Sequence, residues 1–344
     1  MAADPPSLKR NDNCCVRGTA LLEGLRTMSA QEIALLLPGQ GSQFVGMGRD
    51  LAFSHPRAAV AFEQANDVLG FDLRRICWEG PEDDLTRTEN AQPAILLHSY
   101  AVWSCLPDLV RQQVTIAAGH SLGEFSAYLA AGALDFEDAL RLVRRRGELM
   151  GKAGTARPGT MAAVIGLDAK VVRELCLGVS AGTVVPANYN APGQVVISGD
   201  IAAVEEARER AVAAGAKRAV PLNVSGAFHS PLMAEARDGL ALALDGVGVR
   251  DPGFPVVANA AASPIIDAMR ARELLVEQLT SPVRWVECVE SMIGTKPDLW
   301  LEVGPGKVLT GLMRRIDREP DVRAIGSPED LDAVQALLEE SEDA

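Results

Sequence analysis

The segment VTIAAGHSLGEFSAYLA (residues 114–130) joins an apolar run to a glycine-flanked turn and then to small residues. Residues 114–118 predict a buried strand, GHSLG (residues 119–123) a sharp turn, and the residues up to Ala131 a helix. A GxSxG turn between a strand and a helix is typical of a nucleophile elbow, which holds a serine exposed beside backbone N–H groups. Ser121 is therefore a candidate nucleophile.

The alternation of short apolar runs with amphipathic helical stretches continues along the chain after Met28. Residues 33–37 (IALLL) predict the first strand, which ends in PGQGSQ (residues 38–43). The two glycines of that loop let the backbone approach a ligand. This alternation indicates an α/β fold, here a large α/β-hydrolase-like domain with a parallel sheet, whose sites lie at the strand ends.

The middle of the chain has a different order of elements. The order is βαββαβ, with strands at 161–167, 183–188, 194–198 and 217–224 and helices at 169–177 and 202–214. It predicts a small ferredoxin-like domain at 156–225, inserted between parts 29–155 and 226–327 of the large domain. Residues 1–28 are expected to be a flexible extension and residues 328–344 an acidic, solvated segment.

Composition excludes several functional classes. The 344 residues carry 33 Lys plus Arg against 46 Asp plus Glu, a formal net charge of −13, which opposes nucleic acid as a partner. No stretch reaches the roughly 18 to 20 apolar residues of a membrane span. Six cysteines without metal-binding spacing favour a reducing, cytoplasmic location, and no metal is expected. The N-terminal residues lack a secretory apolar core, although an organelle transit peptide remains an alternative.

A lone GxSxG pattern is weak evidence, and this chain contains a second copy at residues 178–182. That copy follows a predicted helix and precedes a strand, the reverse of the order that an elbow requires. Ser180 is therefore interpreted as an ordinary turn residue.

A serine nucleophile needs a base, and histidine is the usual one. Of the four histidines, His120 adjoins Ser121 and is expected to orient the turn. His55 is expected at the surface and His98 in the core. His229 remains as the candidate base, because it lies where the chain re-enters the large domain and can face Ser121 across a cleft.

The helix expected from about Phe136 carries an arginine within its apolar face. Its apolar positions are Ala139, Leu140, Leu142, Val143, Leu149 and Met150. Arg146 falls among them, whereas Arg141, Arg144, Arg145 and Glu148 face the other way, as a solvated stripe. A buried guanidinium needs an anionic partner, which is either a local carboxylate or the carboxylate of a substrate.

Eight blocks together resemble the malonyl-CoA:acyl carrier protein transacylases and the related acyltransferase domains of polyketide synthases. The resemblance covers about Ile33 to Ile325. The blocks are PGQGSQ (38–43), AQPA (91–94), GHSLGEFSA (119–127), RRGELM (145–150), NAPGQVVISG (190–199), GAFHS (226–230), PVRW (282–285) and EVGPGKVLTGL (302–312).

The resemblance implies catalytic roles for five positions. Ser121 would be the nucleophile and His229 its base. The backbone carbonyl of Gln278 would orient the histidine, so the identity of that side chain is expected to matter little. The backbone N–H groups of Gln40 and Leu122 would form the oxyanion hole.

Further positions would bind the acyl group. Arg146, 25 residues after Ser121, matches the arginine that clamps the malonate carboxylate. Phe228 precedes the histidine, as is common in members that select malonyl over methylmalonyl, and Leu122 also fits that type. Phe228 could equally be a core aromatic. Two polar residues match positions that line or brace the site, Asn190 and Gln92.

The resemblance implies transfer of malonyl from coenzyme A to the phosphopantetheine thiol of an acyl carrier protein through a seryl ester, in fatty-acid or polyketide synthesis. It implies no cofactor, and a monomer. The alternatives are a thioesterase or esterase, a transacylase for another dicarboxylic group such as methylmalonyl, and a non-catalytic docking module. An acidic carrier protein would bind a basic patch, either Arg141, Arg144 and Arg145 or Arg314, Arg315 and Arg318.

Overall fold

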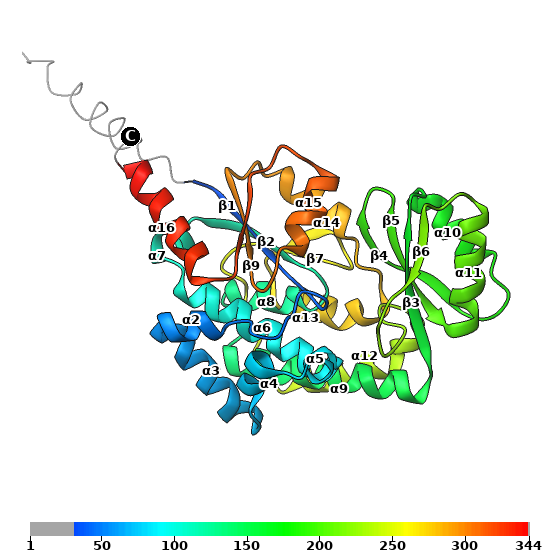
Figure 1. Cartoon of the computed structure of the whole chain (residues 1–344), viewed down its shortest axis with the longest axis horizontal. Coiled ribbons are helices and arrows are strands. Elements are labelled where there is room, and N and C mark those ends of the chain that lie inside the picture. The colour runs from blue at the N-terminus through cyan, green and yellow to red at the C-terminus, as the bar shows by residue number, and fades with distance from the viewer. Residues whose placement is uncertain (1–30, 343–344) are drawn as a thin grey trace, which may run out of the picture.

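The computed structural model describes residues 31–342 and contains two separate sheets (Figure 1). The larger has six strands in the order β10-β9-β1-β2-β7-β8. All neighbouring strands are parallel except β7 and β8. The strands are β1 (Ile33–Leu37), β2 (Val114–Gly119), β7 (Val256–Ala258), β8 (Ser263–Ile265), β9 (Leu299–Val303) and β10 (Val322–Ile325). The predicted mixed α/β fold with a parallel sheet is confirmed.

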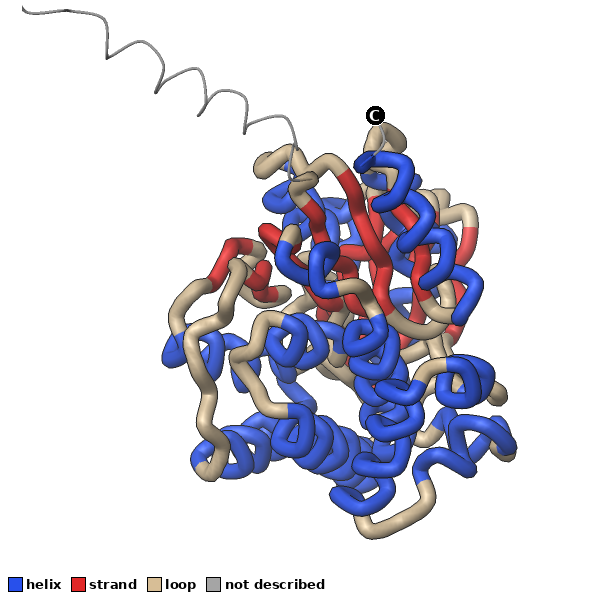
Figure 2. Tube along the Cα trace, turned by 90° about the vertical axis from the view of Figure 1, so that its left-hand side faces the viewer, coloured by secondary structure: helices blue, strands red, loops and turns tan. Residues whose placement is uncertain are grey.

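The first strand is apolar throughout because helices cover both faces of the large sheet. Alternate residues of β1 belong to two different cores. Leu35 packs with helices α6 (Thr88–Cys105) and α9 (Phe136–Ala156), whereas Leu36 packs with α14 (Trp285–Ile293) and α15 (Val308–Ile316). A strand buried on both sides has no polar face, which explains the run IALLL. Figure 2 shows the strands of this sheet in the upper half of the molecule, above a thick layer of helices.

The remaining helices of the large part are mostly short. They are α2 (Arg49–Ser54), α3 (Pro56–Leu69), α4 (Leu73–Glu79), α5 (Glu82–Thr86), α7 (Asp108–Gln112), α8 (Gly123–Ala130), α12 (Ala234–Asp245), α13 (Ala268–Glu277), α16 (Pro328–Glu342) and the 3-10 turns η1 (Pro231–Met233) and η2 (Gln278–Thr280). The acidic end of the chain forms α16, and its Leu331 and Val334 are buried, so this segment is anchored rather than wholly solvated. The predicted extension, residues 1–28, lies outside the described residues. No helix among residues 31–342 is both long and apolar enough to cross a membrane.

The second sheet has four antiparallel strands in the order β4-β5-β3-β6. The elements follow the predicted βαββαβ order: β3 (Gly159–Ile165), α10 (Ala169–Leu177), β4 (Val184–Ala191), β5 (Gln194–Asp200), α11 (Ile201–Ala213) and β6 (Arg218–Pro221). Helices α10 and α11 pack on the face that carries Val164 and Ile197. The prediction that the last strand continues to Val224 is wrong. The Leu222 N–H still donates to the Met161 carbonyl of β3, and residues 223–225 then lead back to the large part.

The two sheets are joined where β4 meets the segment before α14. Val283 donates a backbone hydrogen bond to Ala187 at 2.8 Å and accepts one from Tyr189 at 2.9 Å. These hydrogen bonds attach β4, the edge strand of the small sheet, to the large part. Asn188, Asn190 and Val196 of β4 and β5 line one cavity with Gln40 and Ser121, which follow the carboxyl ends of β1 and β2.

Glu302 is a buried carboxylate at the end of β9 that stabilises the first turn of α15. It accepts hydrogen bonds from the backbone N–H groups of Leu309 (2.9 Å) and Thr310 (2.7 Å) and from the Thr310 hydroxyl (2.7 Å). Burial raises the pKa of this carboxyl. The N–H groups of a helix's first turn have no partner within the helix, so Glu302 supplies the missing acceptors.

We predict that Glu302→Gln lowers the free energy of unfolding by about 2 kcal/mol, because the amide replaces charged acceptors and presents an NH₂ group to donors. Urea unfolding measures the change. The control is Glu319→Gln, which removes the same charge from an exposed side chain and should leave the unfolding midpoint unchanged. Equal effects of the two substitutions would show that only net charge matters.

Candidate active site

Ser121 lies on the turn between β2 and α8, in a strained backbone conformation with φ at 53°. The two flanking glycines make this turn possible. A Cβ on Gly119 would lie 1.9 Å from the carbonyl carbon of Gly123, and one on Gly123 would lie 2.0 Å from the carbonyl oxygen of Leu37. The predicted elbow is present, and its strain aims the hydroxyl away from the sheet.

His229 is positioned as a base for Ser121. Its Nε2 lies 2.7 Å from Ser121 Oγ, and its Nδ1 lies 2.9 Å from the backbone carbonyl oxygen of Gln278. A carbonyl can only accept, so Nδ1 carries the proton and Nε2 accepts the serine hydroxyl. Burial, and then the positive charge of Arg146, lower the pKa of His229 to about 3. The ring is therefore neutral at pH 7 and can take a proton.

Arg146, in the middle of α9, is buried beside the nucleophile. Its Nη1 donates to Gln92 Oε1 at 2.8 Å, and its Nη2 donates to Gln278 Oε1 at 2.8 Å and to Ser121 Oγ at 3.1 Å. Burial lowers the pKa of the guanidinium to about 10, which leaves it charged at neutral pH. No carboxylate of residues 31–336 forms an ion pair with it, so the interpretation as a structural ion pair is wrong. The guanidinium is available to an anion that arrives from outside.

A second set of side chains fixes the backbone of the elbow through hydrogen bonds. The sequence analysis did not identify these residues as part of the site. Asn259 Oδ1 accepts the Ser121 N–H at 2.7 Å, and Gln278 Nε2 donates to the Ser121 carbonyl at 3.0 Å. Both residues also bind one oxygen of the buried Glu124: the Asn259 N–H at 2.9 Å and Gln278 Nε2 at 2.7 Å. Glu124 could have been found from the sequence, because it is a carboxylate in a helix whose other residues are mostly apolar or small. Asn259 carried no comparable signal.

Gln40 and Leu122, whose N–H groups the resemblance assigns to the oxyanion hole, both line the cavity around Ser121. Gln40 lies in the loop after β1, where its side chain donates to Thr88 Oγ1 at 3.3 Å, and Leu122 precedes the first residue of α8. Neither N–H donates to a backbone acceptor among the described residues. A free N–H at a helix N-terminus beside a second free N–H is suited to an oxyanion.

The small sheet and the segment before η1 form walls of the site around Ser121. A cavity of about 160 Å³ surrounds Ser121, and Phe228 lines it while remaining 5% exposed. Asn190 Oδ1 accepts a hydrogen bond from His120 Nε2 at 2.8 Å. Asn190 thus braces β4 against the elbow, and His120 orients the turn as predicted. His98 is fully buried in α6 and His55 is half-buried before α3, so neither reaches Ser121.

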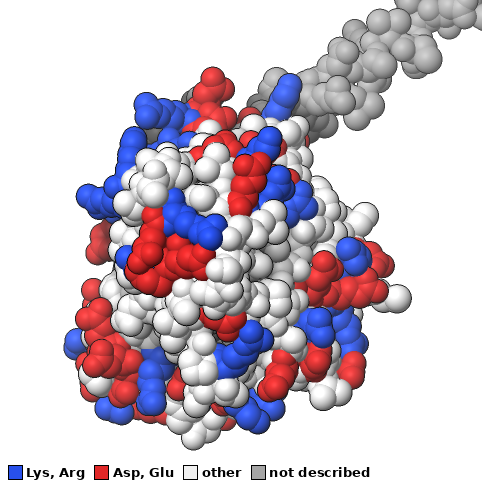
Figure 3. Space-filling model, turned by 90° about the vertical axis from the view of Figure 1, so that its right-hand side faces the viewer, with Lys and Arg blue, Asp and Glu red and all other residues white. Residues whose placement is uncertain are grey.

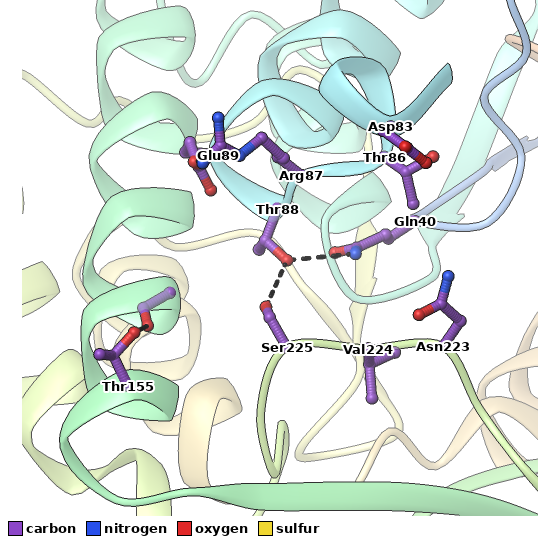
Figure 4. Close-up of a pocket in the computed structure, with 11 residues that line it drawn as sticks. Gln40, Asp83, Thr86, Arg87, Thr88, Glu89, Thr155, Asn223, Val224 and Ser225 are labelled. Atoms are coloured by element: carbon purple, nitrogen blue, oxygen red, sulfur yellow. Dashed lines mark hydrogen bonds and ion pairs between the residues drawn. The ribbon is translucent and has the colours of Figure 1, made fainter. Parts of the chain in front are cut away.

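A larger cavity of about 420 Å³ adjoins this site and shares Gln40 and Val224 with it (Figure 4). Its walls come from the start of α6, the end of α9 and the loop after β6. Thr88 Oγ1 and Ser225 Oγ lie 3.2 Å apart across it, and Figure 4 shows Asn223 on the same wall as Ser225. The hydroxyl and amide groups offer both donors and acceptors.

Comparisons with known proteins agree with this geometry. A malonyl CoA-acyl carrier protein transacylase of Bacillus subtilis is 44% identical over 318 residues, which cover 91% of this chain and 99% of that protein. The Escherichia coli K12 protein of the same name is 43% identical over 309 residues, 90% of this chain and 99% of the relative.

Solved structures share the fold as well. An acyl-carrier-protein-S-malonyltransferase from Bartonella henselae has a TM-score of 0.86 and 44% identity, covering 89% of this chain and 99% of its own. A malonyl-transacylase solved in complex with its type II PKS acyl-carrier protein has a TM-score of 0.83 and 43% identity, with coverage of 89% and 99%. Residues 35–331 match the model of the family described as acyl transferase domain, and the chain therefore belongs to that family.

Proposed function

We propose that this protein transfers malonyl groups from coenzyme A to the phosphopantetheine thiol of an acyl carrier protein, as a malonyl-CoA:acyl carrier protein S-malonyltransferase. The observation that carries this proposal is Arg146, a buried and charged guanidinium that touches the nucleophile and has no carboxylate partner among residues 31–336. The named relatives act on malonyl-CoA and acyl carrier protein. A free carboxylate on the acyl group would supply the anionic partner that Arg146 does not have among these residues.

In the first half-reaction, Ser121 Oγ attacks the thioester carbonyl while His229 Nε2 takes the hydroxyl proton. The N–H groups of Gln40 and Leu122 stabilise the oxyanion. The carbon–sulfur bond then breaks, the coenzyme A sulfur receives the proton from His229, and malonyl-serine remains. Because the pKa of His229 is low, the imidazolium that forms is a strong acid towards the leaving sulfur.

In the second half-reaction, the carrier thiol gives its proton to His229 and attacks the seryl ester. The serine oxygen leaves with that proton, which restores the free enzyme. Two sequential half-reactions through a covalent ester predict ping-pong kinetics. Nucleophile, base and oxyanion donors all come from this chain, so we propose that the reaction uses no metal and no bound cofactor.

Selectivity follows from the charge and the volume of the acyl site. Arg146 favours a dicarboxylic acyl group, and Phe228 occupies the wall where the branch of methylmalonyl would lie. One methyl group changes selectivity by about 1 to 3 kcal/mol, so malonyl is preferred and methylmalonyl is disfavoured without being excluded.

The adjoining cavity of about 420 Å³ is proposed as the path of the pantetheine arm. It opens into the acyl site at Gln40, whose N–H is one of the oxyanion donors. The arm contains two amides, and the side chains of Thr88, Asn223 and Ser225 can bind amides as donors or acceptors.

The two basic patches that are candidates for binding an acidic carrier protein differ in their ion pairs. Arg141 pairs with Glu137 and Asp138, and both Arg144 and Arg145 pair with Glu148, so that patch is locally neutral. Arg314 and Arg318 are exposed and form no ion pair with the described residues.

Helix α15, which carries Arg314 and Arg315 in its last turn, begins close to the loop after β1. Residues 304–307, which precede α15, contact the loop after β1, because a Cβ on Gly306 would lie 3.4 Å from the Ser42 carbonyl oxygen. Figure 3 shows blue and red side chains mixed over most of the face that it draws. We therefore propose the α15 end, marked by Arg314, Arg315 and Arg318, as the carrier docking surface.

Three broader features complete the proposal. Residues 156–225 form a ferredoxin-like insertion in an α/β-hydrolase-like domain, supported by the strand order of the small sheet. A cytoplasmic location is supported by the unpaired cysteines Cys77, Cys105, Cys176 and Cys288. The resemblance to the transacylases also favours a monomer, which we include in the proposal.

We predict that brief exposure to malonyl-CoA adds one malonyl-sized mass to the intact protein, and that added holo acyl carrier protein removes it. Ser121→Ala should show no adduct, because the ester cannot form. Intact-protein mass spectrometry measures both steps. Steady release of coenzyme A without an adduct would instead favour the thioesterase alternative.

We predict that Arg146→Ala lowers kcat/KM for malonyl loading about a hundredfold, because a charge-assisted bidentate contact is lost. Loading with acetyl-CoA, which has no free carboxylate, should fall less than about fivefold. Quenched-flow mass spectrometry gives both rates. Equal losses with the two acyl groups would contradict the assignment of Arg146 to the carboxylate.

We predict that the double variant Arg314→Glu, Arg318→Glu raises KM for the carrier protein about tenfold at low salt and leaves loading from malonyl-CoA unchanged. The matched control is Arg141→Glu on α9, which should change neither half-reaction. An unchanged KM in the double variant, or an equal rise in the control, would place the docking surface elsewhere.

A further inference from the structure

We propose that the carboxamide of Gln278 is a positioning residue that aims Arg146 at the acyl carboxylate. One residue then serves both halves of the site: its backbone carbonyl orients His229 and its side chain orients the guanidinium. This inference rests on the proposed function and reverses the expectation that the side chain at 278 matters little.

The orientation of the Gln278 amide is determined by its partners. Its NH₂ group faces two acceptors, Glu124 Oε2 at 2.7 Å and the Ser121 carbonyl oxygen at 3.0 Å. The Ser121 carbonyl can only accept a hydrogen bond, and the Arg146 guanidinium can only donate one. The NH₂ group must therefore lie on that side, and Oε1 must face Arg146 Nη2, 2.8 Å away.

Two amide oxygens hold the guanidinium without neutralising it. Gln278 Oε1 binds Nη2 and Gln92 Oε1 binds Nη1, both at 2.8 Å, and both glutamines are fully buried. A carboxylate at either position would form an ion pair and use the charge that the substrate needs. Neutral acceptors fix the plane of the guanidinium and leave its charge for the acyl group.

Glu124 shows why the acceptor at position 278 has to be an amide. It is the acidic group whose charge acts on Arg146, yet its carboxylate contacts Gln278 and not the guanidinium. Gln278 thus stands between a buried carboxylate and a buried cation and keeps them from pairing. The titratable groups around this amide are Glu124 from α8, Arg146 from α9 and His229.

The test is a double-mutant cycle with two acyl donors. Gln278→Met keeps the volume and the backbone carbonyl but removes the amide. It should lower kcat/KM for malonyl loading tenfold to a hundredfold, mainly through KM, and that for acetyl loading less than about threefold. In the Arg146→Ala background the same change should add less than about threefold, since it acts through Arg146.

The control is Glu277→Met, an exposed neighbour in the same turn, which should leave both donors unaffected. Equal loss of malonyl and acetyl loading in Gln278→Met, or full additivity with Arg146→Ala, would overturn the inference, because a merely structural role predicts both. Absence of any seryl ester in the unaltered protein would instead overturn the proposed function.

A second variant keeps the inference testable if Gln278→Met does not fold. When ionised, the carboxylate introduced by Gln278→Glu pairs with Arg146, and when protonated it restores one donor and one acceptor. The malonyl-to-acetyl rate ratio of this variant should rise at least fivefold more than that of the unaltered protein from about pH 8 to about pH 6. Burial raises the pKa of Glu124 to about 7, so this carboxyl titrates in both proteins and the difference between them reports on position 278. His229, with a pKa of about 3, stays neutral throughout. A ratio that changes with pH no more in the variant than in the unaltered protein would overturn the inference.

Discussion

A positive charge is buried at the centre of this protein without a negative one against it, and the rest of the site is arranged around that charge. Burying a guanidinium without an ion pair is costly, and hydrogen bonds to neutral groups offset the cost here, together with the charge of the nearby Glu124. Gln92 and Gln278 supply those bonds from α6 and η2, and Ser121 supplies a third from the elbow. Three segments far apart in sequence must meet at α9 before the arginine can be buried.

The same arrangement explains the chemistry of the base. The field of Arg146 and the loss of water both disfavour a second cation nearby, which keeps His229 neutral. An incoming carboxylate neutralises the arginine and so makes the imidazolium easier to form. Binding of an acyl group with a free carboxylate therefore favours the proton transfer from Ser121 to His229.

The sequence predicted the parts of the protein that depend on local pattern. The strand at residues 33–37 and the helix at residues 169–177 have the bounds that their apolar patterns indicated. Arg146 was identified because it interrupts an apolar helical face. The end of β6 was placed wrongly, because Leu222 and Val224 are apolar residues that line the cavity around Ser121 and do not belong to the strand.

The support beneath the elbow could not be read from the sequence. Glu124 meets Asn259 and Gln278 across separations of 135 and 154 residues, and no local pattern records such a meeting. The side chain of Gln278 was undervalued because the resemblance assigns a role only to its backbone.

That backbone role has a consequence for how the protein tolerates genetic change. A catalytic triad that orients its histidine with a carboxylate loses that function by a single codon change. Here the orienting group is the carbonyl of Gln278, and every amino acid supplies a backbone carbonyl. No substitution at position 278 can delete it, so evolution can vary the side chain there, and with it the choice of acyl group, without discarding the general base.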